Sequence, residues 1–250
     1  MFGTGPTVPG VDLNVEAQLL LLDDLSAFYG EMPFSEEKTD GLRYYFANEM
    51  YSYGDAITLY GMIRHLGPKK IVEIGSGFSS CVTLDTNTLF FAGAIDCVFV
   101  EPAPERFLSL LEPDELDSIR LLRSGVQDVN MVLFRELEAN DILFVDSSHV
   151  VKTGSDVDYI LKEVLPNLKT GVWVHFHDIF FPFEYPREWV YQGRSWNEVY
   201  FLRSFLQYNN AFSVQFFSDY LAQFHREQLV SKMPLCARNT GANLWLRKDR

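Results

Sequence analysis

One short stretch constrains the fold of this chain more than any other: the glycine-containing segment at residues 69–80. Its sequence is Lys-Lys-Ile-Val-Glu-Ile-Gly-Ser-Gly-Phe-Ser-Ser. Residues 71–74 predict a short buried strand, and Gly75 and Gly77 predict a tight turn directly after it. The serines that end the stretch are suited to capping a helix. A strand, a glycine turn and a helix N-terminus in this order are typical of a nucleotide-binding site.

The acid within this predicted strand favours one class of cofactor over another. A dinucleotide-binding fingerprint has a third glycine where Ser80 stands, and Glu73 would repel its pyrophosphate. S-adenosylmethionine has no phosphate and carries an ammonium and a sulfonium, which a carboxylate attracts. The pattern Glu73-x-Gly75-x-Gly77 resembles the first motif of class I S-adenosylmethionine-dependent methyltransferases. An ordinary strand-to-helix turn is the alternative for this stretch taken alone.

Composition limits the partners that the chain is expected to bind. Its 250 residues fit one α/β domain, and its formal net charge is -13. This charge argues against nucleic acid and against membrane surfaces as partners, and leaves a small-molecule acceptor. The first six residues lack the basic run of a secretory signal, and Cys81, Cys97 and Cys236 lack metal-type spacing, the first two being expected as buried thiols. A cytoplasmic location is therefore expected, with the oligomeric state open, a homo-oligomer included.

Strand and helix patterns alternate along the chain. Strands are expected at residues 71–74, 94–100, 119–122, 141–146, 172–178, 211–217 and 242–246. Helices are expected at residues 13–29, 55–66, 79–91, 104–112, 155–168 and 195–208. This alternation predicts an α/β fold with a doubly wound, mostly parallel seven-stranded sheet of Rossmann-like type, whose last strand is reversed. Residues 1–53 are expected to form an N-terminal helical lid, and residues 54–250 a single cofactor-binding domain.

Polar residues predict several helix starts, and an aromatic segment predicts one functional loop. Asp55 and Ser155 are expected to cap the helices that follow them, and Ser195 with Glu198 forms a capping-box pattern. Residues 180–189 are rich in aromatic side chains and contain two prolines. We expect this loop to form a wall or lid of an acceptor site.

Functional side chains are expected where the strands end, because parallel strands bring their carboxyl ends to one edge of a sheet. The residues at these ends are Gly75, Glu101, Asp146 and Asp178. Glu101 follows the second strand, where a carboxylate accepts hydrogen bonds from ribose hydroxyls. Val126 and Gln127 follow the third strand and are expected near the adenine.

Acids and histidines gather at the ends of the fourth and fifth strands: Asp146, His149, His175, His177 and Asp178. Two carboxylates on neighbouring strands repel each other unless a cation or a proton intervenes. A divalent metal (Mg, Mn or Fe) between Asp146 and Asp178, with His149 or His177 as a further ligand, would relieve this repulsion. Without a metal, His149 or His177 would act as a general base. Histidines satisfied inside the core are the remaining alternative.

Three motifs carry a narrower resemblance: Glu73-Ile-Gly-Ser-Gly-Phe-Ser-Ser80, Phe144-Val-Asp-Ser-Ser-His149 and Val174-His-Phe-His-Asp178. With them, residues 51–190 resemble the class I group called methyltransferase family 24, which looks related to the catechol-type and macrolide-sugar O-methyltransferases. Those enzymes hold Mg²⁺ with acids at positions that match Asp146 and Asp178. The chain departs from the catechol-type pattern, because His177-Asp178 stands where an Asp-Asn pair is expected.

The resemblance implies transfer of a methyl group from S-adenosylmethionine to an oxygen or nitrogen of a small molecule, with or without a metal. The implied cofactor-binding residues are Glu73, Gly75, Gly77, Ser79, Glu101, Val126, Gln127 and Asp146. The implied catalytic residues are Asp146, His149 and His177, and the implied metal ligands are Asp146, His177 and Asp178. A metal-dependent hydroxylase-like enzyme on the same fold and a non-catalytic nucleoside-binding protein are the alternatives.

Overall fold

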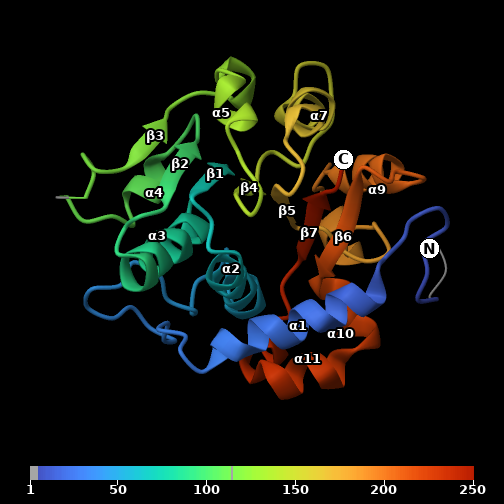
Figure 1. Cartoon of the computed structure of the whole chain (residues 1–250), viewed down its shortest axis with the longest axis horizontal. Helices are drawn as coiled ribbons and strands as arrows, with labels where there is room; N and C mark the ends of the chain where they lie inside the picture. Colours follow the sequence, from blue (N-terminus) through green and yellow to red (C-terminus); the bar gives the residue numbers. More distant parts are fainter. Residues whose placement is uncertain (1–4, 114) are drawn as a thin grey trace.

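The computed structural model describes residues 5–113 and 115–250, and a seven-stranded sheet forms its centre (Figure 1). The strands are β1 (Lys70–Ile74), β2 (Asp96–Val100), β3 (Arg120–Leu122), β4 (Ile142–Val145), β5 (Trp173–His177), β6 (Phe212–Phe217) and β7 (Asn243–Lys248). Their order across the sheet is β3-β2-β1-β4-β5-β7-β6. The first five strands of this order are parallel, and β7 is antiparallel to both of its neighbours. The expected mostly parallel sheet with a reversed last strand is confirmed.

Helices flank the sheet on both sides. They are α1 (Val15–Tyr29), α2 (Tyr53–Leu66), α3 (Phe78–Phe91), α4 (Glu105–Leu108), α5 (Val132–Arg135), α6 (Asp156–Tyr159), α7 (Leu165–Asn167), α8 (Arg187–Tyr191), α9 (Glu198–Leu206), α10 (Ser218–Phe224) and α11 (Arg226–Lys232). Shorter helical turns are the 3₁₀ turns η1 (Val126–Asp128) and η3 (Pro234–Ala237) and the π-helical turn η2 (Ile160–Val164), which joins α6 to α7. Figure 1 shows α2 and α3 on one side of the sheet and α5 and α7 on the other, as a doubly wound fold requires.

The central strands are buried on both faces, which explains their composition. β1, β4 and β5 consist mainly of apolar residues, and nearly all of their side chains are buried. Apart from Lys70, which begins β1 and is only partly buried, the exceptions to the apolar pattern are Glu73, His175 and His177, which are buried. A buried polar side chain normally has a hydrogen-bond partner or a ligand, so these three positions require an explanation.

Two of the predicted helix starts are wrong. The helix α2 begins before Asp55, and Oδ1 of Asp55 instead accepts the N–H of Ala242 at 2.9 Å. The helix α9 begins at Glu198, so Ser195 and Glu198 do not form a capping box, and Glu198 bonds to the loop after β4. The predicted cap at Ser155 is confirmed, because its hydroxyl accepts a backbone N–H of α6. Both wrong assignments concern acids that are buried near the site.

The N-terminal segment contacts both the body of the fold and one cavity wall. The helix α1 packs against α2, α11 and β6 (Figure 1). Met50 and Tyr51 are the described residues before α2 that line a cavity at the functional edge. The expectation about the first residues of the chain falls partly on residues 1–4, which lie outside the described part.

Two further expectations from composition bear on the described residues. Cys81 and Cys236 are buried free thiols, whereas Cys97, expected to be buried, is half-buried. No helix in residues 5–113 and 115–250 combines the length and the apolar character that crossing a bilayer requires.

Candidate active site

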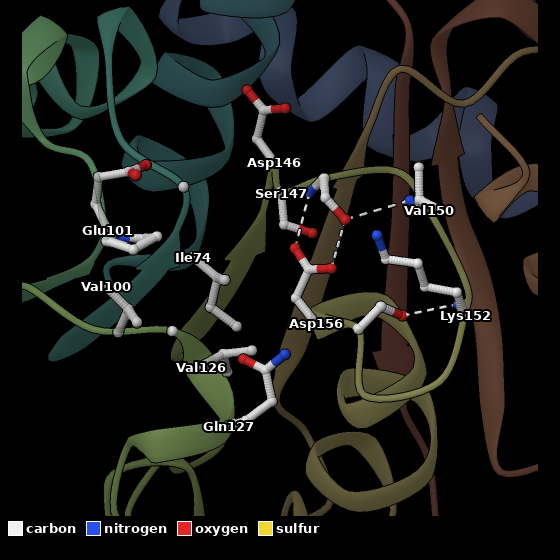
Figure 2. A pocket seen from close by; sticks show the side chains of 15 residues that line it. Ile74, Val100, Glu101, Val126, Gln127, Asp146, Ser147, Val150, Lys152 and Asp156 are labelled. Carbon is white, nitrogen blue, oxygen red and sulfur yellow. Dashed lines mark hydrogen bonds between the residues drawn. The ribbon is translucent and has the colours of Figure 1, made fainter. Parts of the chain in front are cut away.

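Two adjoining cavities open at the edge where the parallel strands end. The first, of about 510 Å³, is walled by the turn after β1, the end of β2, η1 and the segment after β4 (Figure 2). The second, of about 320 Å³, is walled by the same turn and by the ends of β4 and β5. The residues common to both walls are Glu101, Asp146, Ser147 and Ser148. A ligand that extends from one cavity into the other therefore passes these four side chains.

The turn after β1 is tight because the backbone at Gly75 lies against the backbone at the end of β4. Gly75 has a φ of +86°, and a Cβ on it would overlap the carbonyl oxygen of Asp146. The backbone N–H of Asp146 donates to the carbonyl oxygen of Ile74 at 2.9 Å, so β1 and β4 remain joined up to the turn. Gly77 differs, because a Cβ there would meet no atom closer than 3.9 Å, and it lines the second cavity. Gly75 shapes the turn, whereas Gly77 keeps space open beside it.

Glu73 lies beneath the turn, and its side chain is no part of either cavity wall. Its Oε1 accepts hydrogen bonds from Ser79 Oγ at 2.6 Å and from Ser80 Oγ at 2.8 Å. Burial raises the pKa of this carboxyl to about 8, although the two hydroxyls act to lower it. Glu73 is therefore mostly protonated at neutral pH and does not supply the attraction for a cationic cofactor that its sequence position suggests. It fixes the start of α3, from which Ser79 lines the second cavity.

Glu101 stands between the two cavities at the end of β2. Its Oε2 accepts the backbone N–H of Ser76 at 3.1 Å, and its Oε1 accepts that of Ala103 at 2.8 Å. These bonds hold the carboxylate in the wall and leave each oxygen a second lone pair. The structure thus places Glu101 where an acid can accept hydrogen bonds from a nucleoside ribose.

Val126 and Gln127 line the first cavity from η1. Val126 is buried, and Gln127 Nε2 donates to the carbonyl oxygen of Gly154 at 2.9 Å. Figure 2 shows these two residues toward the opposite end of the cavity from Asp146. An apolar side chain and an anchored amide at that end form a surface suited to a planar base.

The segment between β4 and α6 supplies wall residues of the first cavity that sequence reasoning missed. Asp156 accepts the backbone N–H of Ser148 at 2.9 Å and also its hydroxyl (Figure 2). Ser155 Oγ accepts the N–H of Lys152 at 3.1 Å, which holds Lys152 at the rim. An acid just after an N-cap is ordinarily explained by the helix dipole, so the sequence carries no separate signal for this contact.

Four residues of the second cavity carry a buried polar atom without a hydrogen-bond partner in the described part of the chain: Tyr51 Oη, Ser76 Oγ, Ser147 Oγ and His177 Nδ1. Leaving one such atom without a partner costs about 1–3 kcal/mol. Buried polar groups in proteins are paired in the great majority of cases. Further atoms of this kind lie elsewhere in the described part of the chain, but these four lie where polar groups of a ligand could complete their hydrogen bonds.

His149 lies at the centre of a group of carboxylates. Its Nδ1 is 2.8 Å from Glu198 Oε2, and its Nε2 is 3.3 Å from Asp146 Oδ1 and 3.9 Å from Asp178 Oδ2. Burial acts to lower the pKa of His149, but hydrogen bonds to Asp146 and Glu198 raise it to about 10. The ring is therefore an imidazolium at neutral pH. In this arrangement each ring nitrogen of His149 already has a carboxylate neighbour, and the expectation that it acts as a general base stays a prediction.

His177 is placed differently from His149. Its Nε2 is 3.6 Å from Asp178 Oδ1 and its Nδ1 is 3.9 Å from Asp55 Oδ1, so neither nitrogen makes a short hydrogen bond to a carboxylate. Burial acts to lower the pKa of His177, and the charges of Asp178, Asp146 and Asp55 raise it overall. Burial also raises the pKa of Asp55 to about 6. His177 thus keeps hydrogen-bonding capacity for a ligand at the second cavity.

His175, by contrast, belongs to the core. Its ring stacks on Phe144 with centroids 3.9 Å apart, and its Nε2 lies 2.9 Å from Asn243 Oδ1. Burial lowers its pKa to about 3, so the ring is neutral. The expected pairing of His175 and His177 on one face of β5 holds, but only His177 reaches a cavity.

Glu198 is the important residue that sequence reasoning did not assign to the site. It begins α9, is 1% exposed and bonds to His149. The preceding Trp196 packs on the His149 ring with centroids 4.2 Å apart, and Trp189 packs edge-on against Trp196. The aromatic loop at residues 180–189 therefore supports the second cavity from behind, and Trp196 supplies the wall itself.

Backbone contacts also fasten α9 to the loop after β4. The carbonyl oxygen of His149 accepts the N–H groups of Asn197 and Glu198 at 3.0 and 3.2 Å. The Asn197 side chain accepts the N–H of Val151 at 2.6 Å and donates to its carbonyl oxygen at 3.1 Å. Glu198 is thus held opposite His149 by bonds that do not depend on its own side chain.

The family of the central segment follows from a comparison with known protein families. Residues 72–179 match the model of a methyltransferase domain. These residues belong to the methyltransferase domain family. An uncharacterized protein of Archaeoglobus fulgidus is 34% identical to the chain over 143 residues, which cover 56% of this chain and 63% of that protein. The matched part is therefore less than two thirds of the relative's length.

Solved structures resemble the chain more distantly. CmcI-N160 in its apo form gives a TM-score of 0.47 at 15% identity, over 90% of this chain and 84% of that one. CmcI-N160 with SAH gives 0.41 at 15% identity, over 64% and 79%. An S-adenosylmethionine-dependent methyltransferase from Thiobacillus denitrificans, in complex with S-adenosyl-L-homocysteine, gives 0.40 at 14% identity, over 77% and 90%.

The methyltransferase domain does not offer the metal site that the resemblance implies. Across residues 5–113 and 115–250, no group of three or more His, Cys, Asp and Glu side chains is arranged to hold a metal ion. Between two of the expected ligands, Asp146 and Asp178, lies His149 Nε2, at 3.3 Å from one and 3.9 Å from the other. The donor set therefore does not fit a divalent cation in this arrangement.

Proposed function

We propose that the chain is an S-adenosylmethionine-dependent methyltransferase that acts on a small-molecule acceptor bound in the second cavity. The observation that carries this proposal is the junction of the two cavities at Glu101, Asp146, Ser147 and Ser148. A nucleoside in the first cavity would direct its 5′ substituent past these residues. Its reactive end would then face the second cavity, which holds the unsatisfied polar groups.

The residues of the junction fit the parts of the cofactor. Glu101 retains acceptor capacity for the ribose hydroxyls, and Val126 and Gln127 would flank the base. Ser76 and Ser147 carry unpartnered buried hydroxyls suited to the amino and carboxylate groups of the methionine end. When bound, S-adenosylmethionine supplies an electrophilic methyl group.

The side chains of the second cavity would position the acceptor, and one of them would remove its proton. Alignment of the acceptor lone pair with the methyl carbon is the main contribution that a protein makes to such a displacement. We assign proton removal to His177, because His149 has both ring nitrogens engaged by carboxylates. Asp146 lines both cavities, so its carboxyl group would lie beside the sulfonium of a cofactor that spans the junction. These features suit methylation of an oxygen or a nitrogen.

Isothermal titration with S-adenosylhomocysteine tests this function. Micromolar binding is expected both for the protein as purified and for the protein after treatment with a chelator. Glu105→Ala, on the exposed side of α4, is a control that should bind equally well. No binding in either preparation would reject the proposed function, and binding that disappears on chelation would show that a metal organises the pocket.

A further inference from the structure

We infer that the imidazole of His149 occupies the position between Asp146 and Asp178 that a divalent cation would otherwise take. The site described here would then be complete without a metal. The inference concerns the same cavity as the proposed function. It rests on the positions of the described side chains and remains testable if the cavity serves another reaction.

The distances support this placement. A cation shared by the two acids would lie between Asp146 Oδ1 and Asp178 Oδ2, and His149 Nε2 lies 3.3 Å and 3.9 Å from these atoms. The ring is buried and its other face is covered by Trp196. A cation bound directly by both carboxylates would have to displace the ring.

Glu198 fixes the ring in this place. Its Oε2 lies 2.8 Å from His149 Nδ1, and its other oxygen has no partner among the residues that the structure describes. Nδ1 therefore faces one carboxylate and Nε2 faces two others, so the ring stands among the three acids where a shared cation would stand.

Backbone conformation supports a functional reason for the arrangement. His149 and Asp178 both have a φ of +57°, in the left-handed region that non-glycine residues rarely adopt. Such conformations cost of the order of 1 kcal/mol and persist where surrounding contacts enforce them. Both residues belong to the same contact, so the strain is located where the ring meets the acid.

Removal of the ring should expose a metal site, and Mn²⁺ is a suitable probe. Titration calorimetry of chelator-treated wild-type protein with Mn²⁺ is expected to show no saturable binding. His149→Ala leaves Asp146, Asp178 and Glu198 around a vacated space, and we expect it to bind Mn²⁺ at least ~10-fold more tightly than the wild type. The double variant His149→Ala with Asp178→Asn should lose this gained binding. His65→Ala, at the exposed end of α2, should behave as the wild type does.

Each outcome decides the inference. Wild-type protein that binds Mn²⁺ within tenfold of the variant would overturn it, and so would a folded His149→Ala variant that gains no binding. If the alanine variant does not fold, His149→Asn provides a shorter side chain that keeps a donor near Glu198. Titration of the same samples with S-adenosylhomocysteine separates the two hypotheses. If the wild type does not bind S-adenosylhomocysteine, the proposed function is rejected, whereas the inference about His149 still stands or falls by the Mn²⁺ titrations.

Discussion

A Cβ on Gly75 would stand 1.7 Å from the carbonyl oxygen of Asp146. Asp146 lines both cavities, and Gly75 lines the first. The close approach of these two backbones therefore fixes the distance between the ends of β1 and β4 at the place where a ligand would pass from one cavity to the other. The two glycines of the turn therefore have different functions, although they look equivalent in the sequence. One is required by the fold, and the other leaves space for a ligand.

Substitution of the two glycines should separate these functions. Gly75→Ala is expected to lower the free energy of unfolding by about 2–4 kcal/mol, because the clash is with backbone and φ is positive. Gly77→Ala should change it by no more than about 0.5 kcal/mol. Its methyl group would nevertheless narrow the second cavity and weaken S-adenosylhomocysteine binding. Chemical denaturation and calorimetric titration of both variants measure this contrast, and equal losses of stability would contradict it.

Glu101→Ala should weaken S-adenosylhomocysteine binding by about 1–3 kcal/mol, because a charged acceptor for the ribose hydroxyls is removed. The same change also frees the N–H groups of Ser76 and Ala103. Glu101→Gln keeps an acceptor for that backbone and serves as the matched variant. If both variants bind with wild-type affinity, Glu101 does not contact the ribose.

The buried carboxyl group of Glu73 should make the free energy of unfolding decrease as the pH rises. Burial raises its pKa from 4.5 to about 8 in the folded protein, so the stabilisation from its bound proton is complete below pH 4.5. That stabilisation is lost as the pH rises toward 8, with a slope of up to about 1.4 kcal/mol per pH unit. Glu73→Gln should flatten this slope in denaturation curves recorded from pH 5 to pH 8. A variant with the same pH dependence as the wild type would show that Glu73 is ionised in the fold.

Tyr51 and Tyr44 form a matched pair of buried tyrosines. The hydroxyl of Tyr44 donates to the carbonyl oxygen of Tyr51 at 2.7 Å, whereas the hydroxyl of Tyr51 lacks a partner in the described part of the structure. Tyr44→Phe should therefore cost about 1 kcal/mol of stability, and Tyr51→Phe should be neutral or slightly stabilising. Thermal unfolding of both variants tests this. A larger loss for Tyr51→Phe would mean that its hydroxyl bonds within the fold and is not reserved for a ligand.

The sheet was predictable because its signals are local. Strands buried on both faces are written as short apolar runs, and glycine or proline separates them from the helices. The reversed last strand, the methyltransferase family of residues 72–179 and the gathering of Glu101, Asp146 and Asp178 at one edge all agree with the expectations. Parallel topology alone brings these strand ends together.

The electrostatic roles were not predictable, because they depend on contacts between distant residues. Asp55 and Glu198 stand near helix starts, where an acid is ordinarily explained by capping or by the helix dipole. In the structure Glu198 meets His149, and Asp55 faces His177. The sequence also shows that Glu73 is an acid but not that it is buried enough to keep its proton. A charge state depends on burial, which a linear motif does not record.

The bond between Glu198 and His149 has a consequence for protein engineering. The matched domain spans residues 72–179, so it contains His149 but not the partner that holds it. A chimera that joins this domain to the C-terminal part of a relative without an acid at position 198 would inherit a histidine free to turn. Such a hybrid would keep the sequence motifs of residues 72–179 but would lack the negative charge that Glu198 places beside His149. Residue 198 is therefore the position to inspect first when related sequences are sorted into those that place a histidine between the two acids and those that bind a metal ion there.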